Sequence, residues 1–120
     1  MATRAIRCVG SFRDLLVYRR AVQFADEIHA SAADWDSFDR WTVGVQLVRS
    51  ADSIGANVAE SSGRSGTPDQ RRLFFIARGS AFETEHWLER AAERGLTGPA
   101  NAAARAGELS RMLSGLVRRL

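Results

Sequence analysis

The sequence predicts an all-α protein, an antiparallel four-helix bundle of up-down-up-down topology in one domain. Apolar residues recur every three or four positions in four successive stretches, each about 20 residues long. Short segments rich in Gly, Pro, Ser or Asp separate these stretches, and no run alternates in the manner of a strand. Helices of this kind joined by short loops pack as antiparallel neighbours. A chain of 120 residues is long enough to bury a core.

The composition narrows the class of protein. Hydrophobic residues make up 45% of the chain and charged residues 26%, a balance that disfavours disorder. The single cysteine, Cys8, excludes an internal disulfide and a Cys-rich metal site, and is typical of a reducing compartment. No apolar run has the length of a signal-peptide core or a membrane span. We therefore expect a cytoplasmic protein with no membrane partner.

Arginine is the only basic residue type in the chain besides two histidines. All 17 basic residues are arginine, and with 14 acidic residues the net charge is +3. Each guanidinium is a planar fork that suits phosphates and carboxylates. Residues 1–20 and 90–120 are basic, whereas 26–39 contains acids and no base. Residues 1–10 are predicted to be a short basic arm, followed by the bundle in 11–120.

The first helix is predicted from residue 12 to about residue 33. Ser11 provides an N-cap, and Asp14 stands three residues later as its capping-box partner. At 100° per residue, one half of this helix is apolar. That half contains Val17, Tyr18, Ala21, Val22, Phe24, Ala25, Ile28 and Ala32.

The second helix is predicted over 38–62, with Ser37 as its cap and Gly63 at the C′ position. Its apolar half contains Trp41, Val45, Leu47, Val48, Ala51, Ile54, Val58 and Ala59. Gly44 and Gly55 lie within that half. Because glycine weakens a helix by about 1 kcal/mol relative to alanine, we expect close packing at both positions.

The third and fourth helices have clear start and stop signals. Thr67 as a cap and Pro68 at the first helical position begin the third helix, which should end near residue 94 with Gly95 as its stop. Pro99 is predicted to open the fourth helix. Its narrow apolar seam contains Ala102, Ala106, Leu109, Leu113, Leu116 and Leu120.

The third helix is apolar on two sides. The first stripe consists of Leu73, Ala77, Ala81, Thr84, Leu88 and Ala91. The second, nearly opposite, consists of Phe75, Gly79, Phe82 and His86. One reading is a slightly rotated core that takes in both phenylalanines. We favour a homo-oligomer interface formed by Phe75, Gly79 and Phe82, because a bundle helix buries only one side.

The second helix also has an ordered polar side. It contains Gln46, Arg49, Ser50, Ser53, Asn57 and Glu60 at spacings of three and four. This side is either a solvated face or a hydrogen-bonded seam that meets Arg78 or a neighbouring subunit. Short residues such as Ser and Asn are unusual on a free helix surface, which favours the seam.

Enzymatic patterns are weak in this chain. A di-iron site would need the acid-x-x-His pairs and further carboxylates to face the bundle centre. Those candidates are Asp26, His29, Glu60, Glu83, His86 and Glu108. His86 lies about 180° from the core stripe of its helix, which argues against the site. The Arg-to-His spacing of a four-helix ribonuclease, a phosphate loop and a nucleophile elbow are absent from the sequence. We therefore expect no catalytic residue, metal, cofactor or small-molecule substrate.

Arginines interleave with aromatic residues in LVYRR and RRLFFIAR. Ordinary amphipathy explains each arginine singly. Together they are predicted to form a phosphate-binding surface whose affinity depends on salt and ignores base sequence. Its members are Arg19, Arg20, Arg64, Arg71, Arg72 and Arg78.

Three segments resemble a known family. FRDLLVYRRAVQFA, LVRSADSIGANVAESSGR and FFIARGSAFETEHWL are similar to the bacterial four-helix-bundle proteins encoded in intervening sequences of large-subunit ribosomal RNA genes. The accessory protein of diversity-generating retroelements is a more distant relative. The resemblance implies a non-enzymatic, ring-like pentamer, and the retroelement relative binds nucleic acid and a reverse transcriptase. Its polar motif positions correspond here to Arg49, Ser53, Asn57, Glu60, Ser80 and Glu83. Two departures are Gly55, where proline is common, and Ser61, where glycine is usual.

These observations predict a non-catalytic homo-oligomeric scaffold or accessory protein, a pentamer by resemblance. It is expected to bind RNA or DNA weakly through its arginines, with a reverse transcriptase as a candidate partner. The alternative is an adaptor that binds only protein.

Overall fold

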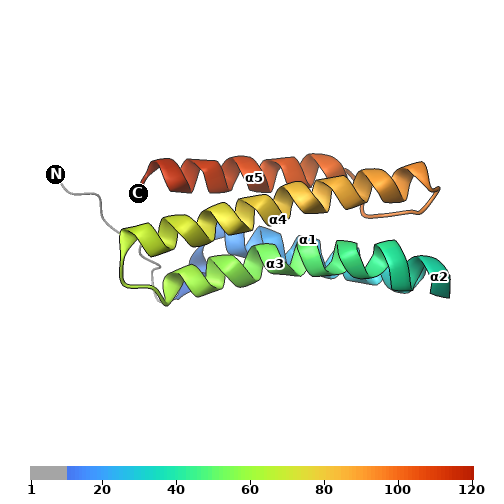
Figure 1. The fold of residues 1–120 in the computed structure, drawn as a ribbon, viewed down its shortest axis with the longest axis horizontal. Coiled ribbons are helices and arrows are strands. Elements are labelled where there is room, and N and C mark those ends of the chain that lie inside the picture. The colour runs from blue at the N-terminus through green and yellow to red at the C-terminus, as the bar shows by residue number, and fades with distance from the viewer. Residues whose placement is uncertain (1–10) are drawn as a thin grey trace.

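The computed structural model describes residues 11–120, so the predicted arm of residues 1–10, including Cys8, lies outside the described part. Within that part all regular structure is helical, and four long helices form the predicted bundle (Figure 1). The elements are η1 (Phe12–Asp14), α1 (Leu16–Ala33), α2 (Ser37–Asp39), η2 (Arg40–Gly44), α3 (Val45–Ser62), α4 (Thr67–Glu93) and α5 (Ala102–Arg118).

The four long helices run alternately up and down and enclose one core. Helix α3 packs most extensively on α4, α4 on α5, and α1 on α3, whereas α1 and α5 meet only sparsely. In Figure 1 the α4–α5 pair lies above the α1–α3 pair, and the long axes of all four are nearly aligned. The edge between α1 and α5 is therefore the most open side of the bundle.

The first predicted helix is divided in two. The capping box is confirmed, because Ser11 Oγ accepts from Arg13 N at 3.1 Å and Asp14 Oδ2 accepts from Ser11 N at 3.1 Å. It caps only the single 3₁₀ turn η1, since Leu15 is extended (φ −71°, ψ 128°) and α1 begins at the next residue. The break lets the Phe12 ring turn back onto Tyr18, with ring centroids 4.9 Å apart.

The start of the second helix differs from the prediction in two ways. Asp36, and not Ser37, is the N-cap, because its carboxylate accepts from Asp39 N at 3.0 Å. The turn η2 is π-helical. Such a turn holds one residue more than an α-helical turn and so shifts the phase of its residues. The placement of Trp41 in the apolar half was therefore wrong: Trp41 is 73% exposed, and Val43 occupies the core.

The two glycines of the second helix do allow close packing. A Cβ on Gly55 would lie 3.4 Å from Val22 Cγ2 of α1. A Cβ on Gly44 would lie 3.2 Å from Asp39 O and 3.6 Å from the ring of Trp35. The space beside Gly44 is thus filled by an indole that is 7% exposed. Glycine at these positions sets how near the neighbouring groups approach α3 and η2.

The helix ends agree with the sequence in part. Gly95 is the predicted stop of α4: it adopts φ 75° and, with the next residue, makes paired bonds to the last turn (Gly95 N–Ala92 O 3.0 Å, Leu96 N–Ala91 O 2.9 Å). Three predictions were wrong. Gly63 was predicted at the C′ position, but it is the C-cap of α3 and has right-handed helical backbone, with φ −85°. Gly66 caps α4 instead of Thr67, and α5 begins at Ala102, after Asn101 with φ 55°, instead of at Pro99.

The core stripes of α4 and α5 follow the predicted phase. All six residues of the first α4 stripe are buried. Phe75 and Phe82 are 40% and 54% exposed, so the reading of a rotated core that takes in both rings is wrong for the single chain. In α5 the seam is buried except at Ala102 and Leu116, which are half-buried, while Val117 is buried. One side of α4 therefore supplies the core, and its second apolar side remains on the surface.

Candidate nucleic-acid interface and polar seam

The polar side of α3 meets α4 through hydrogen-bonded hydroxyl groups. Ser53 Oγ and Ser80 Oγ are 2.9 Å apart. Asn57 Nδ2 donates to Ser53 O at 2.8 Å and to Ser53 Oγ at 3.0 Å. One turn away, Thr84 Oγ1 lies 3.0 Å from Ser50 Oγ and 2.7 Å from Ser80 O. We call this set of five residues the polar seam.

The polar seam continues into the bundle interior. Ser50 and Thr84 are 4% and 0% exposed, and Ser50 Oγ also donates to Leu47 O at 3.0 Å. Among residues 11–120 no buried side-chain nitrogen or oxygen lacks a hydrogen-bond partner. Satisfied buried hydroxyls cost little stability but penalise other registers, in which they would lose their partners. The seam therefore specifies how α3 aligns with α4.

The other predicted seam residues lie elsewhere. Arg49 is exposed on α3, Glu60 Oε1 accepts from Arg64 Nη2 at 2.6 Å, and Glu83 Oε2 accepts from Trp87 Nε1 at 3.0 Å. Arg78, suggested as the partner of the seam, instead donates from Nη1 to Ser114 Oγ of α5 at 3.3 Å. The suggestion placed Arg78 on the wrong side of α4.

Most of the six predicted phosphate-binding arginines contact groups of this chain. Arg20 pairs with Glu108, Arg64 with Glu60, and Arg72 with Asp69, the last at 3.9 Å. Arg71 Nη2 donates to Leu120 O at 2.5 Å, and Arg78 to Ser114 as described. For Arg19, which is exposed, no partner is observed among residues 11–120. The six are spread over α1, α4 and the connection before α4, so they do not form one cluster around a single cleft.

Ion pairs between α1 and α5 were not predicted. Arg105 donates to both carboxylate oxygens of Glu27, at 3.1 Å and 2.5 Å, and its guanidinium carbon lies 4.8 Å from the centroid of the Phe24 ring. This hydrogen bonding is the largest cause that lowers the pKa of Glu27. The Arg20–Glu108 pair lies on the same edge. Charged side chains thus bridge the edge where apolar contact is sparse, and no local pattern marks residues so far apart in sequence.

The second apolar side of α4 is a continuous exposed strip. Phe75, Ile76 and Phe82 are 40%, 41% and 54% exposed, and a Cβ on Gly79 would meet nothing within 4 Å. The guanidinium carbon of Arg78 lies 4.7 Å from the centroid of the Phe75 ring. We call Phe75, Ile76, Gly79 and Phe82 the α4 strip. It combines apolar surface with an adjacent cation.

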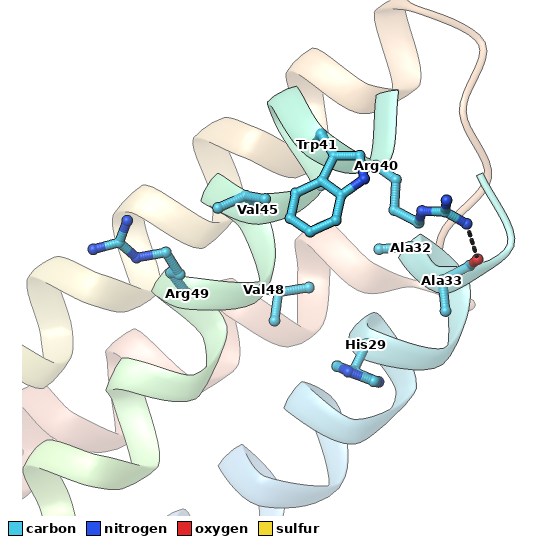
Figure 2. A pocket seen from close by; sticks show the side chains of 9 residues that line it. His29, Ala32, Ala33, Arg40, Trp41, Val45, Val48 and Arg49 are labelled. Carbon is cyan, nitrogen blue, oxygen red and sulfur yellow. Dashed lines mark hydrogen bonds between the residues drawn. The ribbon is translucent and has the colours of Figure 1, made fainter. Parts of the chain in front are cut away.

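A pocket lies where the end of α1, the π-helical turn η2 and the start of α3 meet. Its volume is about 290 Å³, and it is open to solvent. Figure 2 shows Trp41 and His29 at opposite ends of a gap between Val48 and Ala32. Arg40 Nη1 donates to Ala33 O at 3.4 Å. Arg49 also lines the pocket, and in Figure 2 its guanidinium points outward, away from Trp41 and His29. The sequence offered one signal for this pocket, the aromatic residue Trp41, which was assigned to the apolar half of its helix.

The described residues offer neither a metal cluster nor a membrane helix. Within 11–120 no three His, Cys, Asp or Glu side chains gather as a group that could hold a metal ion. The acids and histidines weighed for a di-iron site are instead dispersed: His29 and His86 are exposed, and Glu108 pairs with Arg20. No helix in the same range combines the length and apolarity needed to cross a bilayer.

Comparison with known proteins agrees with this fold. A family model described as 23S rRNA-intervening sequence protein matches residues 13–115. The chain is also similar to a crystal structure described as a protein with unknown function from the S23 ribosomal protein family of Bacteroides thetaiotaomicron VPI-5482. The TM-score is 0.78 at 23% sequence identity, and the alignment covers 86% of this chain and 96% of that chain. A search of curated proteins finds no match.

The solved structure supports the four-helix architecture, and the family match extends over most of the bundle. The likeness to retroelement accessory proteins stays a prediction. The resemblance noted in the three sequence motifs is confirmed: the chain belongs to the 23S rRNA-intervening sequence protein family.

Proposed function

We propose that this protein is a non-catalytic homo-oligomeric scaffold, a pentamer by its family resemblance, that binds RNA or DNA weakly through arginines. The observation that carries the proposal is the α4 strip, an exposed apolar surface with a guanidinium beside it. Contiguous exposed apolar surface marks a site of interaction with another molecule. A reverse transcriptase remains a candidate partner of the assembly.

A second copy of the chain fits the α4 strip for a geometric reason. Gly79 lies between Phe75 and Phe82 and leaves open space where a side chain would project. Small residues between aromatic ones allow a facing helix to approach while the rings interdigitate around it. Self-association would bury rings that a single chain leaves 40% and 54% exposed.

Replacing both rings tests the assembly. Phe75→Asp with Phe82→Asp should reduce the mass measured by sedimentation equilibrium to that of one chain, 13.2 kDa. Phe38→Asp is the matched control, because Phe38 is 75% exposed but lies outside the α4 strip. Far-ultraviolet circular dichroism should be unchanged in all variants. An assembly unaffected by the double substitution, or a wild-type chain that sediments as a monomer, would contradict the proposal.

Two features support nucleic-acid binding: the arginine content, and the guanidinium N–H groups that hydrogen bonds within the chain do not use. A guanidinium has five N–H donors, so the single contact made by Arg71 leaves others for phosphate. Assembly would also add the net charges of several chains, each +3. The resulting affinity is expected to fall as salt rises and to ignore sequence.

Electrophoretic binding across a salt series tests this part. Arg19→Gln with Arg71→Gln should weaken the shift of an RNA probe at low salt. Arg111→Gln with Arg118→Gln removes the same charge at exposed residues outside the predicted surface and should weaken it less. Equal losses from both pairs would show that overall charge, and not this surface, attracts the probe.

The alternative, an adaptor that binds only protein, also has structural support. Arg20, Arg64 and Arg72 are each paired with a carboxylate of the same chain, which lowers the field available to a polyanion. Absence of any salt-dependent shift at low ionic strength would favour the adaptor.

A further inference from the structure

We propose that the pocket between α1, η2 and α3 receives one unpaired base of a single-stranded nucleic acid, stacked on Trp41 with its phosphates at Arg40 and Arg49. This inference deepens the nucleic-acid part of the proposed function and depends on it. It also adds a preference for single strands, which the arginine surface alone does not provide.

Trp41 differs from the other two tryptophans of the chain. Trp35 Nε1 donates to Thr97 O at 2.9 Å and Trp87 Nε1 to Glu83 at 3.0 Å, so both indoles are held by the fold. Trp41 has no observed hydrogen bond within residues 11–120 and is 73% exposed. The π-helical turn places it there, and turns of this kind occur frequently at functional sites. An indole that is mostly exposed is a platform for a planar ring.

The pocket has the size and surface for one small planar group. Its volume of about 290 Å³ lies at the lower end of the range for ligand pockets. Ala32, Val45 and Val48 line it with apolar surface. A base pair or a stacked helix would not enter such a pocket, whereas a single unstacked base would present its face to the indole.

The charges around the pocket favour an anionic ligand. Arg40 and Arg49 line it, and no carboxylate does. Arg49 makes no observed ion pair among the described residues, and Arg40 uses one guanidinium nitrogen for Ala33 O. A stacked base flanked by guanidinium groups is the combination that single-strand binding proteins use.

The acids nearest this end of the bundle lie close to one another and to nearby cations. Asp36 accepts from Asp39 N, the largest cause that lowers its pKa, and it also feels the charge of Arg40. The pKa of Asp39 is raised by desolvation and by the neighbouring Asp36, and the charge of Arg94 offsets only part of this rise. Desolvation raises the pKa of Asp52, and so does the like charge of Asp26, whereas His29 lowers it. None of these four carboxylates lines the pocket, so they repel an anionic ligand only from outside it.

Fluorescence anisotropy with a fluorescein-labelled RNA strand of about 10 nucleotides, and with its blunt duplex, tests the inference. Trp41→Ala should weaken single-strand binding by about 5- to 150-fold, the loss of one base–aromatic stack. Duplex binding should not change. Stacking on Trp41 should quench tryptophan emission when the wild-type chain binds the strand. Trp41→Phe should keep most of the single-strand affinity but abolish this quenching.

Phe38→Ala is the matched control, because that ring is exposed at the same end but does not line the pocket. It should leave single-strand affinity unchanged. If Trp41→Ala binds the single strand as tightly as the wild-type chain does, the assignment is overturned and the exposed indole belongs to a protein-docking surface. If the wild-type chain binds neither form of the probe at low salt, both this inference and the proposed nucleic-acid function fail.

Discussion

The substitution Gly79→Ala should stabilise the single chain, independently of any assembly. Gly79 lies in the middle of α4, and an added Cβ would meet no atom within 4 Å. Alanine is favoured over glycine within a helix by about 0.8–1.0 kcal/mol, partly because glycine gains more freedom on unfolding. With no contact to lose, the free energy of unfolding of the single chain should rise by about 1 kcal/mol.

The assay is urea unfolding followed by circular dichroism, in the background of Phe75→Asp and Phe82→Asp, so that assembly does not contribute. Gly44→Ala is the control within the same fold: its Cβ would lie 3.2 Å from Asp39 O, a backbone atom that cannot move away cheaply. Gly44→Ala should therefore lower stability while Gly79→Ala raises it. A loss of stability from Gly79→Ala would refute the reasoning, because it would mean that the space beside Gly79 is filled in the single chain.

Three further predictions concern stability and pH. Thr84→Val keeps the side-chain volume but removes the hydroxyl that bonds Ser50 and Ser80. It should lower the free energy of unfolding, measured in urea, by about 1 kcal/mol. An unchanged value would mean that this hydroxyl contributes nothing to stability. The pKa of Glu27 is lowered by its hydrogen bond to Arg105, so the pair stabilises the fold above about pH 4.3, and this contribution is lost as pH falls through the folded-state value. Glu27→Gln should therefore flatten the dependence of the urea midpoint on pH in that acid range, and an unaltered dependence would exclude the pair as its cause. Partial desolvation raises the pKa of the exposed Asp52, so its charge opposes folding above about pH 3.9. Asp52→Asn should raise the urea midpoint at neutral pH but not well below pH 3.9, and a lower midpoint at neutral pH would show that the charge is favourable there.

Patterns within short stretches of the sequence were sufficient to predict the four-helix bundle. A repeat of three and four residues identifies a helix and the side it buries, because the α-helix has a constant 3.6-residue turn. The α4 residues Leu73 and Leu88 were assigned to the core by this rule and are buried. Gly95 and the Ser11–Asp14 capping box were equally readable, since a cap needs only residues within one turn.

The same rule failed where the helical phase changes. The π-helical turn adds a residue per turn without a distinctive local sequence, so Trp41 was assigned to the core although it faces solvent. The pocket beside it was missed for this reason. Residue 15 was likewise included in one continuous helix, although its extended backbone separates η1 from α1.

Contacts between helices depend on their relative rotation and axial alignment, which no single segment encodes. The polar side of α3 pointed to a seam, but only packing determines that Ser53 meets Ser80 while Arg78 turns to α5. The Arg105–Glu27 pair joins residues 78 positions apart across the open edge of the bundle. Whether a segment forms a helix depends on residues that are close in sequence. Which side chains meet across helices is decided only when four helices pack around one core and each buries its own apolar side.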